Sequence, residues 1–248
     1  MIFAAGLGTR LKPLTDTCPK ALVEVGGKPL LAHVVEQLQA AGYERMVVNV
    51  HHFADQIESF LRSNQNFGID IRVSDERDML LDTGGGLKKA APLFDHEKNI
   101  LLHNVDILSN VDYEWFSDQH QADEDAVLLV SRRKTKRYLL FDSGMRLMGW
   151  TNIETGEVKS PFPWLRNSAI APSAFPEGLH AFAFSGIHSF SPRLFSLMDR
   201  FPERFPIIDF YLSICHRARI VGCIKDDLQV LDVGKPETLQ QANSQNSQ

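Results

Sequence analysis

Residues 4–31 read AAGLGTRLKPLTDTCPKALVEVGGKPLL, and they connect an apolar N-terminal run to a long loop and then to a helix. The run Met1–Ala5 is too short for a signal peptide and predicts a buried strand. A helix is predicted over Pro29–Ala41, because proline stands at its first turn and Gly42 follows its end. This order predicts the first unit of an α/β sheet.

The same alternation continues through the first half of the chain. Further strands are predicted over residues 45–50, 69–74, 99–103 and 126–132, and helices over 55–63, 86–93 and 113–120. Alternating strands and helices with short connections indicate an α/β, Rossmann-like three-layer sandwich with a mostly parallel mixed sheet. Ligands of such sheets bind beyond the carboxyl ends of the strands. The loops expected to carry function are therefore 6–20, 51–54, 75–85 and 104–110.

The second half of the chain is less regular. A hairpin is predicted around Ser143-Gly144, and residues 160–178 carry the prolines and glycine of a loop. Later strands are predicted over 181–190, 220–224 and 229–231, and helices over 192–198, 207–217 and 236–242. The simplest organisation is one domain, residues 1–248, with a small β insertion and a polar tail at 243–248.

Composition excludes several classes of protein. The net charge is −5, with 26 Lys and Arg against 31 Asp and Glu, and this argues against a nucleic-acid partner, which requires a basic surface. The three cysteines form no CxxC pair, which favours a reducing cytoplasm. No apolar stretch approaches the length of a membrane helix, so no membrane partner is expected. A monomer and a homo-oligomer are both compatible with the sequence.

The loop after the first strand has the chemistry of an anion site. It is not a dinucleotide fingerprint, because Leu11 stands where the third glycine belongs, and Gly27-Lys28-Pro29 is not a P-loop. Gly6 and Gly8, one residue apart, allow the backbone to approach a ligand and expose N–H groups to anionic oxygens. Arg10, Lys12 and Lys20 add positive charge. The alternative is a tight turn followed by a solvated basic loop.

The whole run 4–31 resembles the opening signature of the sugar-1-phosphate nucleotidyltransferase family. The resemblance implies that Arg10 and Lys20 are catalytic residues that contact the phosphates of a nucleoside triphosphate. It also implies that the backbone near Ala4 lies by the nucleobase. The nucleotide-binding residues expected in this loop are Ala4, Ala5, Gly6, Gly8 and Thr9.

A second glycine run, Leu81-Asp82-Thr83-Gly84-Gly85-Gly86, precedes the helix predicted over 86–93. It resembles the nucleobase-side motif of the same family, and in particular its N-acetylmuramate-1-phosphate uridylyltransferase-like branch. The resemblance implies that Gly84 and Gly85 form a backbone surface for a flat base, with Asp82 or Thr83 supplying a hydrogen bond. The alternative is a flexible hinge, or simply the approach to the helix.

Two aspartates stand at predicted strand ends. Asp106 ends His103-Asn104-Val105-Asp106, where Val105 replaces the glycine that is usual in the family, and Asp232 lies in Leu231–Glu237, where Lys235 replaces a common threonine. The resemblance implies that Asp106 is catalytic, that Asp106 and Asp232 together hold Mg²⁺, and that Asn104 contacts the nucleotide. Mg²⁺ prefers carboxylates together with substrate phosphates. Either aspartate taken alone could be a helix cap or a turn residue.

The predicted sugar side is less distinctive. Phe184-Ser185-Gly186-Ile187-His188 resembles the family segment near the sugar phosphate, and Gly186 would allow close backbone contact. Asn152 stands where the family places a sugar contact. His188 alternates along a strand and is expected to be a core residue. The nucleotide-binding half would be residues 1–131, and the sugar-phosphate half 132–242.

Three other features carry weaker expectations. The basic run Arg132–Arg137 is expected to be a solvated strand end, and His51-His52 lacks a partner at metal-ligand spacing. The aromatic residues of 160–178 are expected to form a lid over the sugar or an oligomer contact. These aromatics are Phe162, Trp164 and Phe175.

The predicted function is that of an Mg²⁺-dependent enzyme that joins a nucleoside triphosphate and a sugar 1-phosphate into a nucleotide sugar, releasing pyrophosphate. UTP and an amino-sugar 1-phosphate such as N-acetylmuramate 1-phosphate are favoured. One alternative is a guanylyltransferase for mannose or heptose 1-phosphate. The alternative from another class is a catalytically inactive domain that senses sugar nucleotides.

Overall fold

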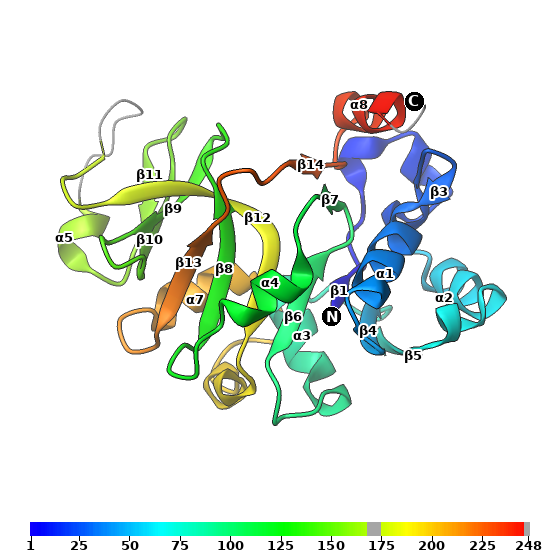
Figure 1. Ribbon diagram of the computed structural model, residues 1–248, viewed down its shortest axis with the longest axis horizontal. Helices are drawn as coiled ribbons and strands as arrows, with labels where there is room; N and C mark the ends of the chain where they lie inside the picture. Colours follow the sequence, from blue (N-terminus) through cyan, green and yellow to red (C-terminus); the bar gives the residue numbers. More distant parts are fainter. Residues whose placement is uncertain (168–174, 246–248) are drawn as a thin grey trace.

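The computed structural model describes residues 1–167 and 175–245, and its centre is a mixed sheet (Figure 1). The strand order is β5-β4-β1-β6-β12-β8-β13. Strands β5, β4, β1 and β6 are parallel, as are β8 and β13, whereas β12 is antiparallel to both of its neighbours. These strands are β1 (Ile2–Phe3), β4 (Arg45–Val50), β5 (Asp70–Asp75), β6 (Ile100–Asn104), β8 (Ala126–Ser131), β12 (His180–Phe190) and β13 (Ile220–Ile224). The predicted mostly parallel sheet is confirmed.

Strand β12 connects the central sheet to a smaller antiparallel branch. Its first residues pair with β9 (Arg137–Phe141), which continues into β10 (Leu147–Asn152) and β11 (Glu157–Lys159). The register of β12 against β8 shifts between Phe184 and His188, and Gly186 within this interval has a φ of 81°. This backbone conformation is readily available only to glycine. The bend therefore lets one strand serve both sheets, and the branch corresponds to the predicted β insertion.

Helices cover both faces of the central sheet, which gives the three predicted layers. One face packs against α1 (Leu30–Ala40), α2 (Ala54–Ser63), α4 (Tyr113–Asp118) and α8 (Pro236–Gln245). The other packs against α3 (Asp82–Ala90), α6 (Phe195–Met198) and α7 (Ile207–Ile214). Because side chains alternate along a strand, Ile2 enters the first core and Phe3 the second.

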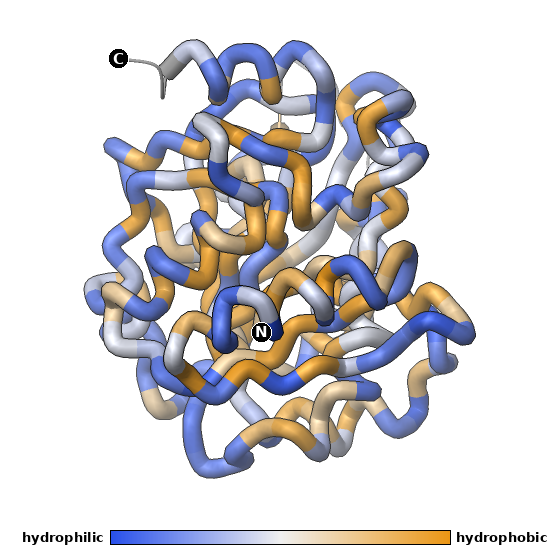
Figure 2. Tube along the Cα trace, turned by 90° about the vertical axis from the view of Figure 1, so that its right-hand side faces the viewer, coloured by the Kyte–Doolittle hydropathy of each residue, from blue (hydrophilic) through white to orange (hydrophobic). Residues whose placement is uncertain are grey.

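The hydrophobic residues that build these cores lie inside the molecule. Figure 2 shows hydrophobic segments crossing the interior, while the outermost loops are mainly hydrophilic. In the part of the chain that the structure describes, no helix has the length and apolar character needed to span a membrane.

Several element boundaries differ from the sequence predictions; α7, for example, ends at Ile214 rather than at Arg217. Helix α3 begins at Asp82 rather than at Gly86, so the glycine run lies inside the helix. Helix α8 continues to Gln245, because the polar residues after Ala242 prolong the helix beyond its packed part. The segment 160–178 contains the short helix α5 (Pro163–Arg166), and its residues 168–174 lie outside the described part.

Candidate active site

The loop that follows β1 is compact. It consists of three 3₁₀ turns, η1 (Thr9–Leu11), η2 (Leu14–Asp16) and η3 (Lys20–Leu22). Gly8 has a φ of 64°, and a Cβ there would lie 2.8 Å from Thr15 Cγ2 and 3.0 Å from Lys20 Cβ. Thr15 Oγ1 donates a hydrogen bond of 2.9 Å to Gly8 O. At Gly8 the start of the loop therefore packs closely against Thr15 and Lys20.

The tip of this loop offers hydrogen-bond donors. The backbone N–H groups of residues 6–8 have no acceptor within the described part of the chain, and Gly6 and Leu7 are exposed. Thr9 and Arg10 are also exposed. Free backbone donors beside a guanidinium are the features that favour binding of phosphate oxygens.

Lys20 and Asp106 form an ion pair between Nζ and Oδ2, although they are far apart in the sequence. Their side chains are only 11% and 16% exposed. Lys20 reaches the pair from η3, and Asp106 lies between β6 and β7 (Ile107–Ser109), at the carboxyl end of a central parallel strand. The ligand edge predicted from the strand order therefore carries a largely buried pair of opposite charges.

Asp232 comes to the same place through a short antiparallel pairing. Strand β14 (Val230–Asp232) pairs with β7 so that Asp232 lies opposite Ile107, and Val233 N donates a hydrogen bond of 2.8 Å to Asp106 O. A Cβ placed on Gly234 would lie 2.6 Å from both Arg10 Nη2 and Asp232 Oδ1. The structure thus gathers four predicted site residues in one place: Arg10, Lys20, Asp106 and Asp232.

The Oδ1 atom of Asp232 is buried and has no hydrogen-bond partner among the described residues. Leaving a buried carboxylate oxygen unpaired costs free energy, so the arrangement favours a ligand that supplies the missing positive charge. No group of three or more His, Cys, Asp or Glu side chains that could hold a metal occurs within residues 1–167 and 175–245. Any cation here would rely on two carboxylates and on oxygens from other sources.

The bend in β12 brings the predicted sugar side to this edge. A Cβ on Gly186 would lie 2.9 Å from Asn104 Nδ2 and 2.9 Å from Ile107 Cγ1. Gly186 is therefore a close neighbour of Asn104 and of Ile107, the residue that begins β7 directly after Asp106. Asn152 is not brought here by any described contact: it ends β10 in the antiparallel branch, and its Oδ1 accepts a hydrogen bond of 3.0 Å from Glu154 N.

The second glycine run packs against its own chain, and its role as a backbone surface for a flat base stays a prediction. Gly84, Gly85 and Gly86 are buried in α3, and the N–H groups of Gly84 and Gly85 donate to Phe205 O at 2.9 and 3.2 Å. A Cβ on Gly84 would collide with Phe205, and one on Gly85 with Glu203 O. Their small size is explained by the close approach of the 203–205 segment.

The two polar residues of that run are engaged with the same segment. Asp82 forms an ion pair of 2.8 Å with Arg204 Nε, and Thr83 Oγ1 accepts a hydrogen bond of 2.9 Å from Ile207 N. A contact of Asp82 or Thr83 with a nucleobase stays a prediction. Arg204 had no signal in the sequence, because its partner is set by the packing of α3 on the chain before α7.

A buried polar pair near the ends of β4 and β5 was also missed. Asn49 Oδ1 accepts from Ala4 N at 2.7 Å, and Asn49 Nδ2 donates to Glu76 Oε1 at 2.7 Å. Glu76 is fully buried, and its burial raises the pKa of the carboxyl group, while the hydrogen bonds from Asn49 and Leu81 oppose that change. Glu76 lies in the predicted loop 75–85, where no local signal distinguishes it, because its neighbours Asp75 and Arg77 are charged as well.

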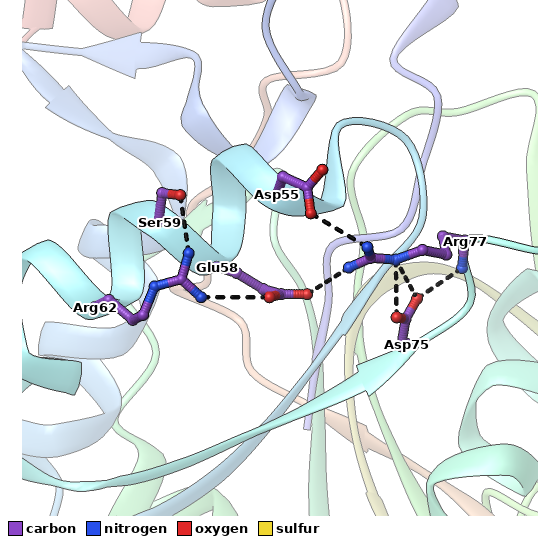
Figure 3. A network of polar contacts seen from close by, with 6 residues as sticks. All are labelled: Asp55, Glu58, Ser59, Arg62, Asp75 and Arg77. Carbon is purple, nitrogen blue, oxygen red and sulfur yellow. Dashed lines mark hydrogen bonds and ion pairs between the residues drawn. The ribbon is translucent and has the colours of Figure 1, made fainter.

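The exposed side of the same loop is held by ion pairs (Figure 3). Arg77 contacts Asp55 and Glu58 of α2 at 3.2 and 2.6 Å, and Asp75 at 2.8 Å. Exposed pairs of this kind contribute little individually to the free energy of unfolding. Their arrangement nevertheless ties the chain after β5 to α2.

Three histidines, His51, His103 and His188, are engaged in contacts within the fold. His188 is buried, its Nδ1 lies 2.8 Å from Tyr211 Oη, and burial lowers its pKa to about 3, which confirms the expected core role. His103 is also buried, its Nε2 lies 2.9 Å from Tyr113 Oη, and burial lowers its pKa to about 4. His51 Nδ1 lies 2.7 Å from Glu76 O.

The basic run and the aromatic segment occupy the antiparallel half. Arg132 is 70% exposed in an ion pair with Asp226, consistent with the expected solvated strand end. Phe162 and Phe175 pack against Leu140 and Leu165, whereas Trp164 is 54% exposed. The lid and the oligomer contact stay predictions.

Comparison with protein families places this chain in a known family. Residues 1–141 match the nucleotidyl transferase family. This stretch includes Arg10, Lys20 and Asp106. The chain belongs to this family. The family predicted from the sequence is confirmed by this match and by two named relatives.

Two relatives of this nucleotidyl transferase carry the same name. The chain is 50% identical over 108 residues to the N-acetylmuramate alpha-1-phosphate uridylyltransferase of Caulobacter vibrioides, a stretch of 43% of this chain and 44% of that protein. It is 40% identical over 113 residues to the N-acetylmuramate alpha-1-phosphate uridylyltransferase of Neisseria meningitidis, a stretch of 46% and 48%. The matched stretches span less than half of each relative.

A solved structure extends the likeness in fold to the whole nucleotidyl transferase chain. The putative glucose-1-phosphate thymidylyltransferase from Bacillus anthracis, solved in complex with sucrose, superposes with a TM-score of 0.78. The superposition covers 99% of this chain and 93% of that one at 18% identity. The antiparallel half, beyond the stretch matched in the family, therefore shares the same fold.

Proposed function

We propose that this nucleotidyl transferase transfers a nucleoside monophosphate from a nucleoside triphosphate to a sugar 1-phosphate. A phosphate oxygen of the sugar 1-phosphate forms a bond to the α-phosphorus, the bond from that phosphorus to the bridging oxygen breaks, and pyrophosphate leaves. The attacking oxygen is already anionic, so no general base is needed. The work of the protein is then positioning and stabilisation of charge.

The observation that carries this proposal is the convergence of two cations and two carboxylates at one sheet edge. Lys20 and Asp106 form an ion pair, and Arg10 lies beside Asp232 across Gly234. Arg10 and Lys20 would offset the charge of the triphosphate and of the leaving pyrophosphate. The free N–H groups of residues 6–8 would bind the same phosphates, with Ala4 and Ala5 near the base.

Mg²⁺ fits the two carboxylates. Asp232 Oδ1 is a buried oxygen without a partner among the described residues, and Asp106 is its neighbour through the β7–β14 pairing. Hard oxygen ligands and a shortage of protein ligands both favour Mg²⁺, which completes its coordination with phosphates and water. When bound, the ion would neutralise charge on the phosphate oxygens.

UTP and an amino-sugar 1-phosphate are the favoured substrates. Support comes from the 50% and 40% identity to two N-acetylmuramate alpha-1-phosphate uridylyltransferases. Gly186 would line the approach of the sugar phosphate, and Asn104 beside it would contact the nucleotide. Asn152 would contact the sugar only if the antiparallel branch closes toward the site. The three cysteines are free thiols, which supports a reducing cytoplasm as the place of reaction.

Pyrophosphate release tests the proposal. The chain is incubated with Mg²⁺ and each of the four nucleoside triphosphates against N-acetylmuramate, N-acetylglucosamine, glucose and mannose 1-phosphates. The highest kcat/KM is expected for UTP with N-acetylmuramate 1-phosphate. Preference for GTP with mannose 1-phosphate would replace it with the guanylyltransferase alternative, and nucleotide binding without release from any pair would favour the sensing domain.

A further inference from the structure

The strongest unexplained feature is a buried negative charge behind the nucleotide loop. Glu76 is fully buried, yet its nearest described partners are a backbone N–H and an amide rather than a cation. Burying a carboxylate in this way is costly unless its oxygens are well satisfied. Asn49 Nδ2 donates to Oε1 at 2.7 Å, and Leu81 N donates to Oε2 at 3.2 Å.

The chain of hydrogen bonds continues to the nucleotide loop. The other end of the Asn49 amide, Oδ1, accepts from Ala4 N at 2.7 Å. Ala4 directly follows β1 and precedes the residues whose free N–H groups face outward. One carboxylate therefore connects the start of the nucleotide loop to Leu81, the residue before α3.

Helix α3 passes directly over this connection. A Cβ on Gly86 would lie 2.5 Å from Glu76 Oε1 and 2.9 Å from Asn49 Nδ2. The pair is thus enclosed by β1, β4, the chain after β5 and α3. Lys89 and His51 are the charged or titratable groups that act on Glu76 from the surrounding elements.

We propose that Glu76 and Asn49 are positioning residues that hold the backbone at Ala4 in place for the nucleotide. Neither touches the substrate; they act through Ala4 and through the start of α3. This inference rests on the proposed function, because it assigns Ala4 to the nucleotide subsite.

The chemistry requires an acceptor with two oxygens at position 76. Two donors face this side chain, and a glutamine offers only one acceptor, so Glu76→Gln leaves one donor facing another. If Asn49 rotates to relieve the conflict, its NH₂ group then faces the N–H of Ala4. With that rotation the disturbance reaches the nucleotide loop, whereas without it the conflict stays between residue 76 and Asn49 or Leu81.

Exchanging the two side chains restores every hydrogen bond. In the double variant Asn49→Asp/Glu76→Gln, the aspartate accepts from Ala4 N and from the glutamine NH₂, and the glutamine oxygen accepts from Leu81 N. The single variant Asn49→Asp instead places two carboxylates face to face. Both single variants should be impaired, and the double variant should recover, as in a coupled pair.

Steady-state kinetics with UTP, Mg²⁺ and the best sugar 1-phosphate tests this prediction. Glu76→Gln should raise the KM for UTP about tenfold, the effect of losing a hydrogen bond to a charged group, with a smaller change in the KM for the sugar 1-phosphate. Simple loss of folded protein would lower kcat and leave both KM values unchanged. The matched control is Glu44→Gln, at an exposed position, which should behave as wild type.

Two outcomes would overturn the positioning role: a wild-type KM for UTP in Glu76→Gln, or a double variant no better than Glu76→Gln alone. If the wild-type chain releases no pyrophosphate, the proposed function fails separately. Calorimetric titration with UTP and Mg²⁺ then decides the pair, since the dissociation constant should rise in each single variant and recover in the double. Equal dissociation constants in all four proteins would refute it.

Discussion

The Lys20 ammonium group and the Asp106 carboxylate form an ion pair at the carboxyl end of β6, within a site where both side chains are largely buried. The backbone oxygen of Asp106 also accepts a hydrogen bond from Val233 N, and Val233 directly follows Asp232. A triphosphate and a cation would therefore enter a site in which Lys20 and Asp106 already neutralise each other, while Asp232 Oδ1 has no partner among the described residues. Each charge has a separate role that substitution can test.

Asp106→Asn should retain the fold and lose most activity. The amide oxygen can still accept a hydrogen bond from Lys20, so the melting temperature should change little, whereas the loss of a metal-binding charge should lower kcat by about 100-fold or more. Pyrophosphate release and thermal melting measure the two effects. Asp118→Asn, at an exposed position of α4, is the control. Turnover close to wild type in the presence of Mg²⁺ would rule out the metal role.

Asp232→Asn should separate stability from activity. Because Asp232 Oδ1 is buried without a partner among the described residues, removing its charge should leave the unfolding free energy in EDTA unchanged or raise it by up to about 1 kcal/mol. The Mg²⁺ concentration needed for half-maximal pyrophosphate release should increase severalfold. Chemical denaturation and a Mg²⁺ titration measure these quantities. A large loss of stability in EDTA would show that Asp232 is structural instead.

Gly8→Ala should destabilise the nucleotide loop. The positive φ of Gly8 costs a residue with a side chain about 1–2 kcal/mol, and the new Cβ would press on Thr15 and on Lys20. A decrease of several degrees in melting temperature is expected for a chain of this size, with weaker binding of UTP. Gly6→Ala is the matched control for stability, since no atom lies within 4 Å of a Cβ placed there. Equal melting temperatures for the two variants would contradict this account.

Mild acid should destabilise the protein through its buried histidines. Burial lowers the pKa of His103 to about 4 and that of His188 to about 3, below the value of about 6.5 expected in the unfolded chain. The unfolded state therefore takes up protons first, and stability is lost as the pH falls below about 6.5.

The variant His188→Gln tests this linkage, because it removes one of the buried histidines whose pKa is lowered. The loss of unfolding free energy between pH 7 and pH 5 should become smaller by about 1–2 kcal/mol, whatever the absolute stability of the variant. Urea denaturation at intervals across this range gives the comparison. Parallel pH profiles for variant and wild type would show that His188 does not contribute.

Sequence patterns predicted the helices and strands well where the signal is local. The proline at its start and Gly42 beyond its end placed α1 to within a residue, and β4 was predicted over the same residues that form it. The start of α3 was wrong, because a glycine run normally disfavours a helix. Here the backbone N–H groups of Gly84 and Gly85 bind Phe205 O, and this long-range contact outweighs the local preference.

The amino-acid sequence by itself determined the alternation of strands and helices, the cations of the loop after β1, and the two aspartates at strand ends. These features depend on periodicity and on residue types within a few positions of one another. Only the tertiary structure decided that β14 pairs with β7, which brings Asp232 beside Asp106, and that Asn49 links Ala4 to Glu76. Such contacts join residues far apart in the chain, and their partners are selected by packing and by the need to satisfy buried polar groups.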